Sequence, residues 1–169
     1  MDVLDAIRTR RSVRLYQDRP VPEELIRQVI EAAMCAPSAR NAQPWHFVVL
    51  DERTILDRIP AFAPNAEMTR RATAAILVCA DPRLELSPGY YPLDCAAATE
   101  NLLLAAHGLG LGAVWCGVYP VQPRIDGFRR LLKLPEEVVP HSLIVLGFPA
   151  ELPPDQDRSR PNRIHRNGW

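Results

Sequence analysis

A dense group of basic side chains near the start of the chain is the feature of this sequence best suited to chemistry. Residues 10–14 read Arg-Arg-Ser-Val-Arg, which places three guanidinium groups and a hydroxyl within five positions. Because a guanidinium group presents a planar fork of hydrogen-bond donors, it matches the geometry of phosphate oxygens. The chain as a whole has 20 basic and 20 acidic side chains. The cluster is therefore a local feature, and it predicts a binding site for an anion.

A second segment has the composition of a binding loop. Residues 36–45 are rich in proline and lead into an apolar strand, and they carry Ser38, Asn41 and Gln43. Hydrogen-bonding side chains that stand on a rigid base are typical of binding sites. The alternative interpretation is a polar turn whose side chains bind only the local backbone.

A glycine-flanked strand and a basic tail are weaker candidates. Residues 110–117 read Gly-Leu-Gly-Ala-Val-Trp-Cys-Gly, and glycine lets the backbone approach a flat ligand closely. A helix cap, a strand and a turn explain the same residues, and no phosphate-loop motif is present. Arg158 and Arg160 stand at alternate positions, so they share one side of an extended chain. A solvated tail is the alternative for this pair.

The overall composition argues against several classes of protein. The formal net charge is 0 at pH 7, whereas general nucleic-acid and membrane-surface binders need a sustained basic field. No apolar run reaches the ~20 residues of a membrane span. The four cysteines and four histidines lack zinc-site spacing, so we expect reduced thiols and no metal. The first residues do not resemble a secretory signal, which predicts a cytoplasmic protein.

The pattern of apolar residues predicts one α+β domain, with about four strands covered by helices on both faces. The strict strand–helix–strand alternation of a doubly wound fold is missing. The segment Pro92–Leu109 is apolar around much of its circumference, which predicts burial in a core or between subunits. Helices are expected after an Asp2 cap, from Pro22 to about Ala36, and at Arg53–Ile59, Pro92–Leu109 and Ile125–Leu132; strands are expected at Trp45–Leu50, Ala74–Ala80, Gly112–Val118 and Ser142–Gly147.

In their order along the chain, these motifs resemble those of the FMN-dependent nitroreductase family. Arg-Arg-Ser-x-Arg is followed by Pro-Ser-x-x-Asn-x-Gln-Pro-Trp, then by Gly-Leu-Gly-x-x-Trp after a long Ala/Leu helix, and finally by Arg-x-Arg near a C-terminal Trp. The resemblance covers nearly the whole chain. It implies a single domain, 1–169, with a mixed central sheet, in an intertwined homodimer that binds FMN at its interface. It also implies that residues 149–169 form an arm that crosses to the partner subunit.

The resemblance assigns residues to both ends of the cofactor. Arg10 matches an arginine that grips the FMN phosphate, and Ser12 matches a residue along the ribityl chain. Arg14 would lie beside the pyrimidine edge, where a cation stabilises the reduced ring. Arg11 belongs to the same cluster, but adjacent residues on a helix face different ways, so an outward structural ion pair is its alternative role. The remaining matches are Pro37, Ser38, Ala39 and Asn41 in a loop from the other subunit, Trp115, Cys116 and Gly117 by the central ring, and Arg158 and Arg160 at the phosphate.

The implied activity is hydride transfer from NADH or NADPH to the flavin, followed by reduction of a nitroaromatic, a quinone or a similar small acceptor in ping-pong kinetics. The flavin would carry the chemistry, so no side chain is predicted as an acid, base or nucleophile, and Cys116 is interpreted as apolar filling. A flavin-binding protein without turnover is one alternative, and a flavin-fragmenting or dehalogenating enzyme is another. The chain is short where larger members insert a lid. This implies either a more open pocket or a narrower set of contacts, from Phe62, Tyr90, Tyr91 and Tyr119.

Overall fold

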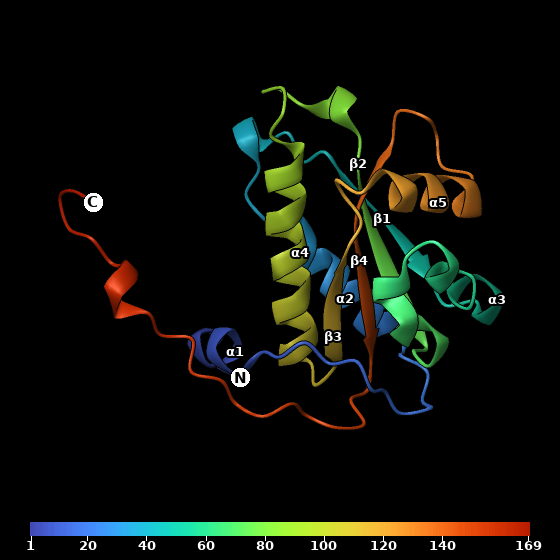
Figure 1. Cartoon of the computed structure of the whole chain (residues 1–169), viewed down its shortest axis with the longest axis horizontal. Coiled ribbons are helices and arrows are strands. Elements are labelled where there is room, and N and C mark those ends of the chain that lie inside the picture. The colour runs from blue at the N-terminus through green and yellow to red at the C-terminus, as the bar shows by residue number, and fades with distance from the viewer.

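The most apolar segments of the chain form the centre of the structure, a computed structural model that describes residues 1–169. Each predicted strand is present, and helices cover both faces of the resulting sheet (Figure 1). The predicted α+β class is confirmed. The helices are α1 (Val3–Thr9), α2 (Glu23–Met34), α3 (Arg53–Leu56), α4 (Tyr91–Gly108) and α5 (Gln122–Leu132), and the strands are β1 (Trp45–Leu50), β2 (Ala74–Ala80), β3 (Gly112–Gly117) and β4 (Val139–Gly147).

The four strands lie in the order β1-β2-β4-β3, and all three neighbouring pairs are antiparallel. The resemblance had implied a mixed sheet, but within one chain the four strands pair only in antiparallel fashion. The reason is topological: α4 carries the chain from β2 to β3, which runs parallel to β2, but β4 inserts between these two strands and runs against both. A parallel contact exists only at the sheet edge, as an isolated bridge between Ser12 and Ala113.

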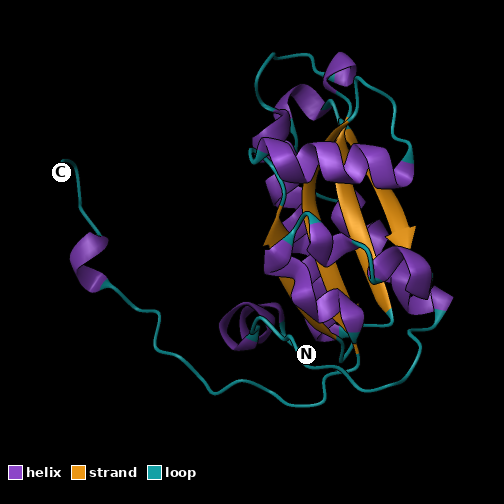
Figure 2. Cartoon of the chain, turned by 45° about the vertical axis from the view of Figure 1, so that its right-hand side comes forward, coloured by secondary structure: helices purple, strands orange, loops and turns teal.

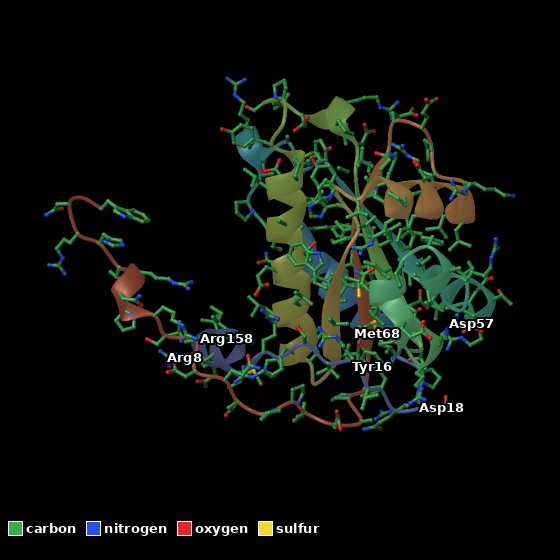
Figure 3. All side chains as sticks on the ribbon, viewed as in Figure 1. Arg8, Tyr16, Asp18, Asp57, Met68 and Arg158 are labelled. Carbon is green, nitrogen blue, oxygen red and sulfur yellow. The ribbon has the colours of Figure 1, made fainter.

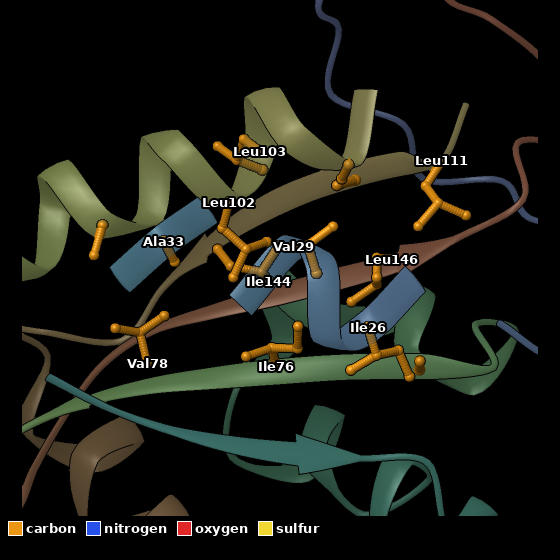
Figure 4. Close-up of a cluster of buried hydrophobic side chains, with 14 of the residues drawn as sticks. Ile26, Val29, Ala33, Ile76, Val78, Leu102, Leu103, Leu111, Ile144 and Leu146 are labelled. Atoms are coloured by element: carbon orange, nitrogen blue, oxygen red, sulfur yellow. The ribbon is translucent and has the colours of Figure 1, made fainter. Parts of the chain in front are cut away.

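The two faces of the sheet carry separate apolar cores, and the sheet lies between their helical layers (Figure 2). Helices α2 and α4 cover one face, where Val29, Leu102 and Ile144 are fully buried (Figure 4). The segments α3 and α5, with short 3-10 helices, cover the other face around Phe128 and Leu143. The expected burial of the long apolar helix is confirmed for its inner side.

The starts of three elements reflect local chemistry. The Asp2 carboxylate accepts a hydrogen bond from the Leu4 N–H at 2.9 Å and caps α1, as predicted. Helix α5 begins three residues earlier than predicted, because Pro123 is tolerated in a first helical turn. Strand β4 also begins three residues early, and Pro140 enters it next to a register shift between Val78 and Cys79.

The C-terminal residues leave the body of the protein. They are anchored at their root, where the Ala150 N–H donates to the Leu15 carbonyl at 2.9 Å and Pro149 forms a bridge with Tyr16. Beyond this point the chain extends past α1 and away from the sheet (Figures 1 and 2). We call residues 151–169 the arm, and all of them except Pro153 are exposed. None of the helices combines the length and apolar character needed to cross a bilayer.

Candidate functional site

Two of the predicted phosphate-binding arginines, Arg10 and Arg158, meet beside α4. Arg10 directly follows α1, and its Nε lies 3.3 Å from Oε1 of Glu100. A guanidinium nitrogen of Arg158 donates to the Arg10 carbonyl at 3.2 Å. Both side chains line a cavity of about 480 Å³, together with Arg8 and Glu100, and Figure 3 shows Arg8 and Arg158 close together. Arg8 was missed by the sequence reasoning, because it precedes the motif.

The geometry of Arg10 fits a bound anion. Its Nε is buried, and although Glu100 is near, the nitrogen has no hydrogen-bond partner. A buried donor without a partner is destabilising, and such groups are rare in native proteins. A phosphate oxygen in the adjoining cavity would supply the missing acceptor. Three guanidinium groups around one cavity exceed the charge of the neighbouring carboxylates, Glu100 and Asp157, so a net positive site remains.

Arg11 differs from its neighbours because its hydrogen-bonding groups are already engaged within the protein. The residue is buried, and its guanidinium group donates to the carbonyls of Arg8, Arg10 and Pro154 and to Oδ1 of Asp155 at 2.7 Å. The ion pair predicted as its alternative role is present, although the Arg11 side chain is buried and only its partner Asp155 is exposed. Its effect is to fix the base of the arm that carries Arg158.

Arg160 is not brought to the cavity in this structure. It is exposed, and its guanidinium group turns back onto its own segment, where it donates to the carbonyls of Asp157 and Ser159. Arg158 alone of the predicted tail pair therefore reaches Arg10.

Ser12 and Arg14 lie along the free edge of β3. The Val13 N–H donates to the Ala113 carbonyl at 3.0 Å, which continues the bridge at Ser12. Buried Tyr16 fixes the end of this segment, because its hydroxyl donates to the carbonyls of Val13 and Val145. Alternation along this extended stretch buries residues 11 and 13 and exposes Ser12 and Arg14. Ser12 thus lies beside Ala113 near the start of β3, and Arg14 lies further along, close enough for its charge to lower the pKa of Cys116.

The thiol of Cys116 faces the core rather than this edge. Its Sγ lies 3.5 Å from the Asn65 carbonyl and 3.8 Å from Sδ of Met68. Burial raises the pKa of Cys116 to about 11, with a smaller opposing effect from the Arg14 charge. The thiol is therefore protonated at neutral pH and is no nucleophile, which agrees with its interpretation as apolar filling.

The last residue of β3, Gly117, leaves open space beside the sheet. A Cβ built on this glycine would meet no atom within 4 Å. Its carbonyl accepts a hydrogen bond from Arg124 at 2.7 Å and a longer one, 3.4 Å, from Asn65. The backbone is thus held from one side and free on the other, as a flat ligand requires. Arg124 carries no recognisable motif and was missed from the sequence.

An aromatic group borders this open space. The His141 ring stacks on Tyr119 at 6.0 Å and packs against Trp115 at the same centroid separation. Tyr91 meets Tyr119 edge-to-face at 5.8 Å. Phe62, in contrast, packs against Phe128 on the other face of the sheet. The structure therefore brings together only part of the predicted pocket set.

Replacing His141 with a residue that does not titrate is expected to reduce the loss in the free energy of unfolding between pH 7 and pH 4. Burial lowers the pKa of His141 from 6.5 to about 4, so the neutral form contributes stability above pH 6.5 that is lost progressively as the pH falls towards 4. The full shift corresponds to about 3 kcal/mol. Denaturant unfolding between pH 4 and 7 checks this: His141→Phe should lose less stability over this range than wild type. Parallel pH profiles for wild type and His141→Phe would contradict the prediction.

The loop at residues 37–41 lies apart from the arginine site. It is next to the first turn of α4, where the Ala39 N–H donates to Oδ1 of Asp94 at 2.9 Å. Helix α1, which Arg10 follows, instead lies at the other end of α4, where Thr9 contacts His107 (Figure 1). Pro37 and Asn41 are exposed and Ser38 and Ala39 are half-buried. Within one chain, the predicted residues thus form two groups: the arginine site with the β3 edge, and this loop.

Comparisons with known proteins found similar sequences and similar solved structures. Residues 7–71 and 63–148 match the model of the Nitroreductase family. A Methanothermobacter thermautotrophicus protein named NADH dehydrogenase/NAD(P)H nitroreductase is 54% identical over 169 residues, which are 100% of this chain and 88% of the relative. A solved structure with the same name from Parabacteroides distasonis has a TM-score of 0.95 at 41% identity, covering 99% of this chain and 98% of its own. A Desulfovibrio desulfuricans nitroreductase structure in complex with FMN has a TM-score of 0.86 at 32% identity, covering 100% and 98%.

Proposed function

This chain belongs to the nitroreductase family, and we propose that it is an FMN-dependent oxidoreductase that takes hydride from NADH or NADPH and reduces a nitroaromatic, a quinone or a similar small acceptor. The observation that carries the proposal is the buried Nε of Arg10, which lies near Glu100 but has no hydrogen-bond partner, in a cavity that Arg8 and Arg158 also line. A cationic cavity of this kind suits the phosphate of FMN. The FMN complex of the Desulfovibrio relative supports the choice of cofactor.

The residues of this chain would hold the cofactor along the edge of β3. Arg10 and Arg158 would bind the phosphate, joined by Arg160 if its side chain turns from its own backbone. Ser12 and Arg14 follow at alternate exposed positions, so they would meet the ribityl chain and the ring in that order. The open space at Gly117 would admit the central ring. When bound, the flavin supplies the hydride-accepting and hydride-donating chemistry.

We also propose that the protein functions as a homodimer. The loop at residues 37–41 lies too far along α4 to join the arginine site of its own chain, so we assign it to the site of the partner subunit. Large apolar side chains are exposed on the arm and on the outer surfaces of two helices, as expected of surfaces that pair. They are Leu152, Ile164 and Trp169 on the arm, Val3, Leu4 and Ile7 on α1, and Leu93 on α4.

Anaerobic mixing tests the proposed activity. The purified protein is expected to be yellow, and chromatography of the released cofactor should identify FMN rather than FAD. Addition of NADH or NADPH without oxygen should bleach the flavin band, and a quinone or nitroaromatic should restore it. The absence of flavin uptake, or release of FAD, would contradict the cofactor assignment. Uptake without bleaching by either nucleotide would favour a flavin-binding protein without turnover.

A further inference from the structure

The loop at residues 37–41 has a backbone conformation that its own residues do not favour. Arg40, Asn41 and Gln43 have φ values of 55°, 56° and 49°, in the left-handed region that residues other than glycine seldom adopt. Such a conformation persists only where the surrounding structure holds it. Hydrogen bonds to Ser38 from the Asn41 and Gln43 N–H groups close the turn internally. They do not fix it to the rest of the protein.

One buried side chain connects this loop to the body of the protein. Asp94 is 5% exposed, and its Oδ1 accepts the Ala39 N–H at 2.9 Å. The other side-chain contact from the loop to the body lies on the surface, where Arg40 donates to the Leu86 carbonyl at 3.3 Å. Because the bond to Asp94 is shorter and shielded from water, whereas the Arg40 bond is long and exposed, Asp94 is the firmer anchor.

The surroundings of Asp94 tolerate a carboxylate, but packing does not require one. Asp94 lies in the first turn of α4, where the helix dipole stabilises a negative charge. Its Oδ2, however, is buried and has no hydrogen-bond partner. An apolar side chain of similar size would avoid that desolvation penalty. The bond that Oδ1 makes to the loop is the contribution that an apolar residue could not supply.

We propose that Asp94 is a positioning residue for flavin binding, which acts by holding the Ala39 N–H and thereby the conformation of residues 37–41. This inference rests on the proposed function, in which the loop belongs to the partner subunit's site. Because the arginines take the phosphate end of that site, the loop is assigned here to the flavin ring. Asp94 itself touches no cofactor. Its loss should therefore weaken contacts to the ring and leave contacts to the phosphate unchanged.

Two substitutions remove the same hydrogen bond from opposite sides. Asp94→Ala removes the acceptor. Ala39→Pro removes the donor and keeps the carboxylate; Ser38 has extended dihedrals that suit a residue before proline, and position 39 opens a 3-10 turn. Each variant of the full chain is expected to bind both FMN and riboflavin about tenfold more weakly. The ratio of the two affinities should stay at the wild-type value, because the phosphate site is intact.

The double variant distinguishes positioning from general destabilisation. If one bond accounts for both effects, the double variant should bind flavin no more weakly than either single variant. Asp94→Asn keeps an acceptor oxygen and should recover most of the affinity. Asp126→Ala, which removes a carboxylate from α5 that accepts only from Gln122, should equal wild type. The visible absorption band of bound flavin should shift in the two single variants and not in this control.

The experiments distinguish failure of the proposed function from failure of the inference about Asp94. If wild type takes up neither FMN nor riboflavin, the proposed function is wrong and this inference falls with it. If wild type binds both flavins and the two single variants bind them equally well, the inference alone is overturned. Additive losses in the double variant, or a changed FMN-to-riboflavin ratio, would also overturn it. Should Asp94→Ala fail to fold, Ala39→Pro decides the outcome because it leaves Asp94 in place.

Discussion

Deletion of the arm, residues 151–169, is expected to abolish dimer formation and to weaken FMN binding at least about a hundredfold. The deletion removes Arg158 and Arg160, each a candidate for a charge-assisted contact to phosphate, and such contacts contribute roughly 1.5–3 kcal/mol apiece. It also removes Asp155, the acidic partner of buried Arg11. Ending the chain at Ala150 keeps the root of the arm, including the bond to the Leu15 carbonyl. Light scattering and an FMN titration would measure both effects.

A matched pair of variants separates the two roles of the arm. The full-length chain with Arg158→Ala and Arg160→Ala loses the phosphate contacts and keeps the apolar residues Leu152, Ile164 and Trp169. We expect this variant to remain a dimer and to bind FMN weakly, whereas the truncated chain should lose both properties. A truncated chain that stays dimeric and binds FMN like wild type would contradict both the crossing arm and its part in the phosphate site.

The sheet and its helices could be predicted from the sequence because burial leaves a pattern in residue type. All residues of β2 are buried, and its sequence is a continuous apolar run. The α2 segment repeats apolar residues at helical spacing, and Ile26, Val29 and Ala33 are the buried ones. The pairing of the strands left no such pattern. Which strand inserts between β2 and β3 depends on long-range contacts, and the mixed pairing implied by the resemblance was wrong for the single chain.

Site residues that lie close together in one sequence motif could be predicted from the sequence. Ser12 and Arg14 are exposed at alternate positions, as one extended segment requires. The partners that come from other elements were not predictable: Glu100 beside Arg10, Arg124 on the Gly117 carbonyl, and Asp94 on the Ala39 N–H. Each is a single charged residue on a helix, and nothing in its local sequence distinguishes it from a solvated one. Their roles depend on tertiary contacts.

The inward direction of Arg11 illustrates the same limit. Its position next to Arg10 suggested that the two side chains would face different ways, and they do have different ionic partners, Glu100 for Arg10 and Asp155 for Arg11. Helical spacing alone could not show which of them enters the protein. Burial of Arg11 follows from the path of the arm, since Pro154 and Asp155 supply its acceptors from the far end of the sequence.

Replacing Arg10 or Arg14 with alanine is expected to change different properties: Arg10→Ala the affinity for FMN, and Arg14→Ala the reduction potential of the bound flavin. Arg10→Ala removes a contact to the phosphate, so the affinity for FMN should fall about tenfold to a hundredfold. Flavin that remains bound should keep its reduction potential, because the phosphate is far from the ring. A titration with riboflavin should show little difference from wild type. Arg27→Ala, an exposed arginine that pairs with Glu24 on α2, is the control and should change neither property.

Arg14→Ala should instead change the potential more than the affinity. Arg14 is exposed beside the end of β3, where the proposed binding mode places the ring rather than the phosphate. A cation there interacts more favourably with the ring once reduction has made it negative, so removal of the cation should lower the reduction potential. For an exposed charge the decrease should be on the order of tens of mV. A spectroelectrochemical titration of flavin-saturated variants measures it. If Arg10→Ala shifts the potential and Arg14→Ala does not, the flavin lies along β3 in the opposite direction from the one proposed.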